Sequence, residues 1–307
     1  MTSPAGRQKT VGQLIEFAVD LLDKAELSFG HGSDNPADEA IHLVLFSLQI
    51  RHDDYSSSLN CAVADQQWDA AVGLINQRIS TRQPAPYLTG IAWLHGLEFI
   101  ADRRALIPRS LLVEAMSDSL QDWMQTMLEH DYPAHWPGQI LDLCCGSGSI
   151  AIHAAMHFHQ AKVLASDLSE DALSLCRENL TRHDLQTRIE AIQSDLFSEI
   201  TNRRFDLILC NPPYVNDASM CALPNEFLAE PDAALRGGYD GMEVIARILE
   251  QAPDHLTEHG LIVIEIGHEA QGFEDRFSEL EFSYLPVTAG DQMVVVLTRF
   301  QLIEGVA

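Results

Sequence analysis

The chain has 307 residues, and its hydrophobic content of 46% is enough for two domains with buried cores. Its formal net charge of −26 disfavours duplex DNA as a working substrate, because an acidic field repels phosphate and attracts basic protein. Residues 1–106 hold 8 basic against 13 acidic residues, whereas residues 107–307 hold 11 against 32. A solvated acidic surface, or adaptation to salt, would give the same balance. With no run of about eighteen apolar residues and no basic-then-apolar start, the sequence predicts a cytoplasmic protein without a membrane partner.

Residues 1–83 are predicted to form a small helical domain that docks the substrate. Apolar residues recur there at intervals of three and four, as expected for amphipathic helices. A glycine-rich loop separates the first two helices, and Asn35 before Pro36 is a good helix start. Residues 84–109 are expected to be a linker, in which two short apolar runs form a β-hairpin. After it, Ser110 is predicted to cap one amphipathic helix that continues through Leu128.

Residues 110–307 are predicted to form an α/β domain around a doubly wound, mostly parallel sheet of seven strands. Strand and helix patterns alternate there, which is typical of a parallel sheet with helical crossovers. The last two strands flank a turn containing Gly290, so we expect them to add an antiparallel hairpin at the sheet edge. The seven expected strands are residues 140–143, 162–166, 188–193, 205–210, 261–266, 282–287 and 293–298.

A glycine-rich turn after the first of these strands predicts a nucleoside site. Gly146, Gly148 and Ala151 form a G-x-G-x-x-A pattern, which lets a ligand approach the backbone but does not by itself separate a dinucleotide from other nucleosides. Asp167 ends the second strand and can accept hydrogen bonds from both ribose hydroxyls; a helix-capping role is the alternative. Asp142 ends the first strand, where a carboxylate would oppose a pyrophosphate but tolerate a sulfonium cation. The pattern therefore favours S-adenosylmethionine over NAD.

Asp195 and Leu196 end the third strand, where they would reach an adenine ring, although an ordinary turn is the alternative. Cys144 and Cys145 are expected to pack in the glycine-rich turn. The chain has no C-x-x-C pair, so its six cysteines are expected to be reduced thiols. Three histidines have metal-like spacing but no acidic ligand pattern beside them, so we expect a helix face and no metal: His153, His157 and His159.

The sequence Asn211-Pro212-Pro213-Tyr214 follows the fourth strand and is the principal candidate for chemistry. Two prolines end the strand and stiffen the loop beyond it. The Asn211 side-chain oxygen and the Pro212 carbonyl then become two acceptors at the edge of the sheet where open α/β folds bind ligands. With the flat ring of Tyr214 beside them, they suit a planar group that ends in NH2. A stiffened strand exit without chemistry is the alternative.

Three motifs follow one another along the chain: the glycine-rich turn after Asp142, the acidic Asp167 after the second strand, and Asn211-Pro212-Pro213-Tyr214 after the fourth. Their order resembles that of the amino-methyltransferases with the seven-strand S-adenosylmethionine fold. Along nearly its whole length the chain resembles the HemK/PrmC group of protein-glutamine methyltransferases, and within this group the PrmB-type branch. One departure is Cys145, where a threonine is usual. The stretches that carry the group resemblance are residues 87–90, 107–109, 230–231 and 237–241, and those that carry the branch are 29–36, 93–99, 108–110, 142–144 and 223–227.

The resemblance implies methyl transfer from S-adenosylmethionine to the side-chain amide nitrogen of a glutamine in large-subunit ribosomal protein number three, with S-adenosylhomocysteine as product and no metal. The implied partner is that basic protein, alone or in an assembling ribosomal particle, and not DNA. The implied catalytic residues are Asn211, Pro212 and Tyr214. The implied cofactor-binding residues are Asp142, Cys144, Gly146, Gly148, Asp167, Leu168, Asp195, Leu196 and Asn211. The implied substrate-binding residues are Asn211, Pro212, Pro213, Tyr214, Arg109 and Glu230.

Three alternatives remain at this point. The same chemistry could act on a peptide-chain release factor. A DNA amino-methyltransferase is disfavoured by the charge and by the lack of an added target-recognition domain. A catalytically silent ribosome-assembly binder would keep the cofactor for stability, but intact Asn211 and Asp167 argue against it. For Arg109 and Glu230, an ion pair that holds the linker is an alternative to substrate binding.

Overall fold

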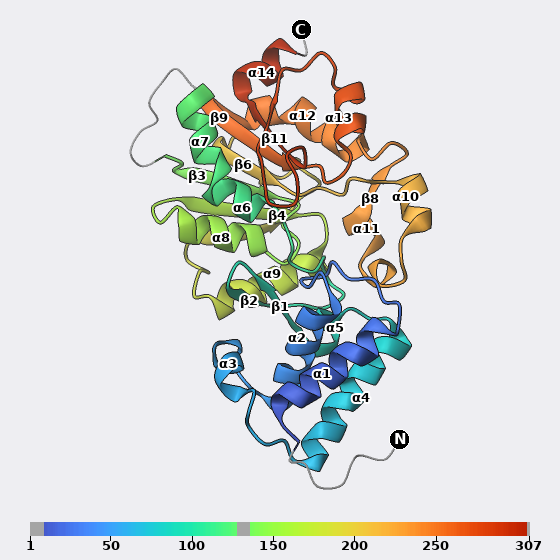
Figure 1. The fold of residues 1–307 in the computed structure, drawn as a ribbon. Helices are drawn as coiled ribbons and strands as arrows, with labels where there is room; N and C mark the ends of the chain where they lie inside the picture. Colours follow the sequence, from blue (N-terminus) through green and yellow to red (C-terminus); the bar gives the residue numbers. More distant parts are fainter. Residues whose placement is uncertain (1–8, 128–135, 306–307) are drawn as a thin grey trace. The chain divides into compact units, whose positions relative to one another are not determined.

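The computed structural model describes residues 9–127 and 136–305, which form two compact units (Figure 1). The first unit comprises the described residues up to Ala92 together with Leu223–Ala229. The second begins at Trp93 and resumes at Glu230. The sequence predicted a docking domain up to residue 83, a linker up to residue 109 and a catalytic domain after it. This assignment stays a prediction.

The first unit is helical, and its first two helices begin where the sequence supplies capping side chains. Thr10 accepts a hydrogen bond from the backbone N–H of Gln13 at the start of α1. Asn35 accepts from two backbone N–H groups at the start of α2, which confirms the predicted helix start. Buried leucines and alanines of α1, α2 and α4 form its core. The helices are α1 (Val11–Asp23), α2 (Pro36–Leu48), η1 (His52–Asp54), α3 (Tyr55–Ser58), α4 (Asp65–Thr81), α5 (Ala85–Thr89) and, from the returning segment, η2 (Phe227–Ala229).

A buried group of charges ties the segment Leu223–Ala229 to this helical unit. Arg78 of α4 is fully buried, and its Nε donates to Glu39 at 2.8 Å. Glu226, also fully buried, pairs with Arg82 at 2.8 Å and accepts from the backbone N–H of Ser28 at 3.2 Å. Burial opposes ionisation of Glu226, but hydrogen bonds from backbone N–H groups and the nearby arginines hold its pKa below the usual value. Removing one of these partners would leave a buried charge unpaired, which is costly.

The second unit contains a seven-stranded sheet with the order β10-β11-β9-β6-β3-β4-β5. Neighbouring strands from β9 to β5 run parallel, β11 is antiparallel to β9, and β10 is antiparallel to β11. The predicted fold class and the antiparallel edge are therefore confirmed, although β10 is only two residues long. The strands are β3 (Gln139–Leu143), β4 (Lys162–Asp167), β5 (Ile189–Gln193), β6 (Phe205–Cys210), β9 (Leu256–Glu265), β10 (Ser283–Tyr284) and β11 (Val294–Thr298).

Helices cover both faces of this sheet (Figure 1). One apolar core lies between the sheet and α6, α8 and α9, and a second between the sheet and α12, α13 and α14. The prediction of one helix after Ser110 is wrong, because Asp118 separates α6 from α7; Leu128 lies outside the described residues. The helices are α6 (Leu112–Ser117), α7 (Ser119–Met127), α8 (Ser149–His157), α9 (Glu170–Arg182), α10 (Asp217–Ala222), α11 (Asp232–Leu235), α12 (Glu243–His255), α13 (Ala270–Arg276) and α14 (Arg299–Glu304).

The sheet register brings the predicted site motifs to one edge. Leu143 of β3 lies opposite Ser166 of β4 on one side and Cys210 of β6 on the other. The turns that follow these three strands therefore leave the sheet side by side. Two small sheets complete the fold: β1 (Ile91–Leu94) with β2 (Leu97–Ile100), as predicted, and β7 (Val215–Asn216) with β8 (Arg236–Gly238).

Candidate active site

A cavity of about 180 Å³ lies at the edge of the sheet where β3, β4 and β6 end. The continuous stretch of residues 104–110 forms one wall, and the turns after β3 and β4 line the cavity as well. The predicted site residues that line it are Arg109, Cys144, Gly146, Asp167, Leu168, Asn211 and Pro213. Those that do not line it are Asp142, Gly148, Pro212, Tyr214, Asp195, Leu196 and Glu230.

The glycine-rich turn between β3 and α8 has the backbone shape that its glycines permit. Gly146 and Gly148 have φ of +53° and +78°, in the left-handed region that favours glycine. A Cβ on Gly148 would lie 2.6 Å from the sulfur of Cys176, so this glycine allows the turn to pack against α9. Gly146 instead lines the cavity, and its N–H donates to the Asp167 carboxylate at 2.8 Å.

Asp167 stands at the end of β4 and is mostly buried. Its two oxygens accept hydrogen bonds from the backbone N–H groups of Gly146 and Ser169, at 2.8 and 2.9 Å. Burial raises its pKa, and these hydrogen bonds oppose the rise. Ser169 itself caps α9 by accepting from the N–H of Ala172, so Asp167 is not needed for that role. Leu168, beside it, is 64% exposed and presents an apolar side chain at the cavity.

Asp142 is completely buried inside β3. One carboxylate oxygen accepts from the N–H of Ala151 at 2.8 Å, and the other has no hydrogen-bond partner among the described residues. Desolvation raises its pKa to about 8. Its predicted role toward a cationic ligand stays a prediction, because the Asp142 side chain does not line the cavity.

In the loop after β6, Asn211 lines the cavity, whereas Tyr214 does not line it and is held by other parts of the protein. The Tyr214 hydroxyl donates to Glu265 of β9 at 3.2 Å. Its ring packs against Gly267, where a Cβ would lie 2.6 Å from a ring carbon. Gly237 approaches the Tyr214 backbone as closely, with 2.7 Å from its hypothetical Cβ to Cα. The ring thus contacts the protein interior, and its predicted packing on a substrate amide stays a prediction.

Arg109 and Glu230 form a bidentate ion pair. The two guanidinium nitrogens lie 2.5 and 2.7 Å from the two carboxylate oxygens, and Glu230 also accepts from the N–H of Ile107 at 3.0 Å. Burial disfavours the charge on Arg109, but the neighbouring Glu230 outweighs it and the pKa of the guanidinium is raised. The structure therefore contains the ion pair that was the alternative to substrate binding by these two residues. Arg109 also lines the cavity, and its predicted contact with a substrate stays a prediction.

Asp195 and Leu196 have partners away from the cavity. Asp195 pairs with Arg247 of α12 at 2.9 and 3.0 Å, and both side chains are about half exposed. Leu196 is buried in the core under α12. Their predicted contact with an adenine ring remains untested.

The histidines and cysteines were predicted to have structural roles only. His153 Nε2 lies 3.2 Å from the Leu94 carbonyl, and burial lowers its pKa to about 4. Among the described residues, no three or more His, Cys, Asp or Glu side chains are grouped to hold a metal. All six cysteines fall within the described ranges and are free thiols.

Comparison with known proteins identifies the family. Residues 117–241 match the family model of the methyltransferase small domain. The ribosomal protein uL3 glutamine methyltransferase of Bordetella pertussis is 42% identical over 294 residues, 96% of each chain. That of Burkholderia pseudomallei is 40% identical over 309 residues, 98% of each chain. The chain belongs to the ribosomal protein uL3 glutamine methyltransferase family.

This membership confirms the resemblance to the PrmB-type branch and shows that the protein is a methyltransferase. Among solved structures, a methyltransferase from Pyrococcus furiosus matches with a TM-score of 0.44 and 16% identity, over 67% of this chain and 90% of that one. A match at this level adds no argument about function, and the fold rests on the sheet order given above.

Two residues at the site of this uL3 glutamine methyltransferase family member were not predicted from the sequence, Glu265 and Arg104. Glu265 is buried; besides Tyr214, it accepts from the Ser110 hydroxyl at 2.6 Å and from the Leu111 N–H at 2.9 Å. Burial raises its pKa, and these hydrogen bonds counteract the rise. One signal was present: Glu265 is the only charged residue in the apolar run 261–266. Arg104 lines the cavity, and nothing in the local pattern marked it.

Proposed function

We propose that the protein transfers a methyl group from S-adenosylmethionine to the side-chain amide nitrogen of a glutamine in ribosomal protein uL3. The observation that carries the proposal is the position of Asn211, which lines the same cavity as Asp167 and the glycine-rich turn. Relatives that are 40–42% identical over nearly the whole chain are named for this activity, which supports the same substrate here.

The residues around the cavity fit S-adenosylmethionine. Asp167 would accept from the ribose hydroxyls, and Leu168 would cover the adenine. Asp142 does not line the cavity, but its buried, unused oxygen would favour the positive end of the ligand. When bound, S-adenosylmethionine supplies an electrophilic methyl group and leaves as S-adenosylhomocysteine. No metal is part of the proposal.

The protein's own contribution is to position a weak nucleophile. An amide nitrogen reacts poorly because its lone pair is delocalised into the carbonyl. In the proposal, the Asn211 side-chain oxygen and the Pro212 carbonyl accept the two N–H groups of the glutamine, orient its nitrogen and stabilise the positive charge that develops on it. Pro213 stiffens the loop, and the hydrogen bond from Tyr214 to Glu265 fixes its base.

The proposed partner is a basic ribosomal protein, either free or in an assembling particle, and not DNA. Residues 107–307 hold 32 acidic and 11 basic residues, a balance that attracts basic protein. The helical part of the chain is proposed to dock this substrate. Within the described ranges, none of the helices is long and apolar enough to cross a membrane. A ribosomal protein substrate makes the cytoplasm the proposed location.

Binding of S-adenosylmethionine at pH 7 is expected to release up to about one proton from Asp142. The pKa of its carboxyl group is about 8, so the free protein holds it largely protonated at pH 7, and a bound cation favours the ionised form. Affinity should therefore rise with pH until the pH passes about 8 and then level off. Calorimetry in two buffers of different ionisation enthalpy measures the proton release. The same release from Asp142→Asn would contradict this origin.

The activity itself is tested by offering several substrates in parallel. The protein and radiolabelled S-adenosylmethionine are incubated with uL3, a peptide-chain release factor and duplex DNA in separate reactions. Label is expected in uL3 alone. Variants of uL3 in which one glutamine at a time is replaced by asparagine then locate the methylated residue. Label only in the release factor would move the same chemistry to another protein. Label in none of them, despite cofactor binding, would favour a silent assembly factor.

A further inference from the structure

The stretch of residues 104–110 is the wall of the cavity that faces the glycine-rich turn. All seven of its residues line the cavity. It contains no helix or strand, since β2 ends at Ile100 and α6 begins at Leu112. Buried Ala105 packs against Ala172 and Leu175 of α9, and side-chain contacts at the two ends of the stretch add to this packing.

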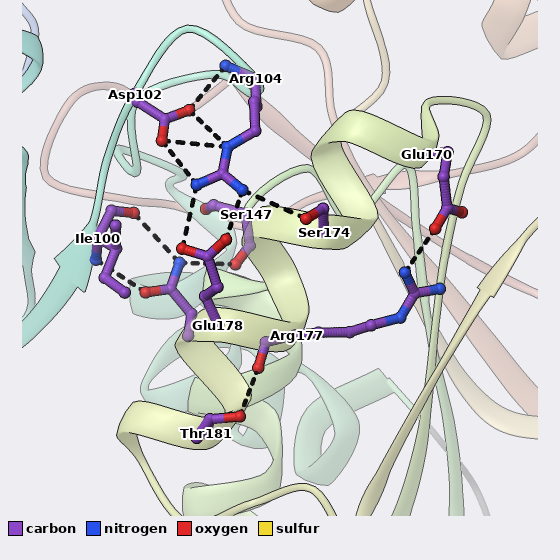
Figure 2. A network of polar contacts seen from close by, with 10 residues as sticks. Ile100, Asp102, Arg104, Ser147, Glu170, Ser174, Arg177, Glu178 and Thr181 are labelled. Carbon is purple, nitrogen blue, oxygen red and sulfur yellow. Dashed lines mark hydrogen bonds and ion pairs between the residues drawn. The ribbon is translucent and has the colours of Figure 1, made fainter.

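At its first end, the stretch is held to α9 by Arg104 (Figure 2). The guanidinium donates to both oxygens of Asp102, with 2.9 Å from Nε and 2.7 Å from Nη2. It also contacts both oxygens of Glu178 on α9, at 2.5 Å from Nη1 and 3.1 Å from Nη2, and it lies 3.3 Å from the Ser174 hydroxyl. One planar group thus makes a bidentate contact with Asp102 on its own segment and another with Glu178, and the second joins the wall to the helix.

Asn179, the residue after Glu178 on α9, bonds to the backbone on both sides of this arrangement. It is fully buried, accepts from the N–H of Ile100 at 2.7 Å and donates to the Ile100 carbonyl at 3.2 Å. It donates as well to the carbonyl of Ser147 in the glycine-rich turn at 3.1 Å. One buried amide therefore joins the end of β2, four residues before the wall, to the glycine-rich turn.

The two ends of the wall differ in their exposure to solvent. At the far end, the side chain of Glu230 is fully buried and holds both Arg109 and the N–H of Ile107. At the near end, the side chains of Arg104 and Glu178 are 29% and 45% exposed. Exposed ion pairs contribute less than buried ones and weaken in salt. The near end is thus the part of the wall that can open.

We propose that Arg104 and Glu178 are positioning residues that latch the 104–110 wall over the bound adenosyl group and so limit its release. The proposal rests on the cofactor assignment made above. The proposed chemistry assigns no role to either residue. Weakening the latch should therefore raise the rate at which S-adenosylmethionine and S-adenosylhomocysteine dissociate, with the folded protein preserved.

The test measures dissociation rates of S-adenosylhomocysteine by stopped-flow fluorescence in the full-length protein. Glu178→Gln and Arg104→Gln are each expected to raise the rate about three- to tenfold. Arg104→Lys, which keeps the charge but loses the planar fork, should fall between these variants and the wild type. Added salt should accelerate release from the wild type more than from Glu178→Gln.

Arg177→Gln is the matched control, because Arg177 lies on the same helix and pairs with Glu170 at 2.6 Å, away from the wall (Figure 2). Its dissociation rate should equal that of the wild type. If Glu178→Gln fails to fold, Asp102→Asn tests the latch from the wall side. Wild-type rates in the latch variants, or an equal rise in Arg177→Gln, would overturn the latch. A wild-type protein that binds neither compound would instead overturn the cofactor assignment and the latch with it.

Discussion

Replacing Asn211 by alanine is expected to lower kcat for glutamine methylation about a hundredfold or more, while the dissociation constant for S-adenosylmethionine changes less than threefold. The proposed role of the side chain is to accept from the substrate amide as positive charge develops on its nitrogen, and one such preorganised contact accounts for about 10²–10³ in rate. Asn211 lines the cavity directly after β6, so it can reach a substrate there. Single-turnover kinetics with saturating cofactor, together with calorimetry, separates the two effects.

Asn216→Ala is the control for disturbance of the same loop. The Asn216 amide donates to Glu269 at 2.9 Å and does not line the cavity, so its loss should change kcat far less. Unchanged turnover in Asn211→Ala would refute the proposed role of Asn211. A weakened dissociation constant with normal turnover at saturation would make it a cofactor-binding residue.

Replacing Asp167 by alanine is expected to weaken S-adenosylmethionine binding about thirty- to a hundredfold. The carboxylate would lose its hydrogen bonds to the ribose, and hydrogen bonds to a charged group contribute about 1.5–3 kcal/mol each. The backbone N–H groups of Gly146 and Ser169 would also lose their acceptor, which loosens the turn. Isothermal titration gives the dissociation constant directly, and Asp167→Asn should have an intermediate effect.

Asp195→Asn provides the comparison, since the sequence analysis placed Asp195 beside the adenine. The half-exposed pairing of Asp195 with Arg247 leads us to expect less than a threefold change. A large loss of S-adenosylmethionine binding in Asp195→Asn would support the predicted contact between Asp195 and the adenine. An unchanged dissociation constant in Asp167→Ala would remove Asp167 from the cofactor site.

Much of the fold could be predicted because its signals are local. The strand at residues 205–210 has the predicted bounds, and the hairpin predicted within residues 84–109 is present. Apolar runs of this length and the turn residues around them define strands without knowledge of distant partners. The break at Asp118 was missed because the apolar spacing continues across it, so periodicity alone predicted one helix.

The side-chain partners of the site could not be predicted, because they are far apart in the sequence. Glu265 meets Ser110 across 155 positions, and Arg104 meets Glu178 across 74. Asp142 and Asp167 both end or nearly end strands, yet one is fully buried and the other lines the cavity. Which carboxylate contacts a ligand depends on the direction of each strand exit, and that direction comes from the assembled sheet.

The segment Leu223–Ala229, which returns to the helical unit through buried Glu226, affects how this protein can be divided. The polypeptide passes from one unit to the other three times, after Ala92, after Ala222 and after Ala229. A cut in the linker would separate Arg82 from Glu226, leave Arg78 with Glu39 alone, and expose the Glu226 carboxylate on the other fragment. The helical part is therefore not a continuous module that a single cut can detach. A chimaera that exchanges it between relatives must carry the seven-residue segment along with the first 92 residues.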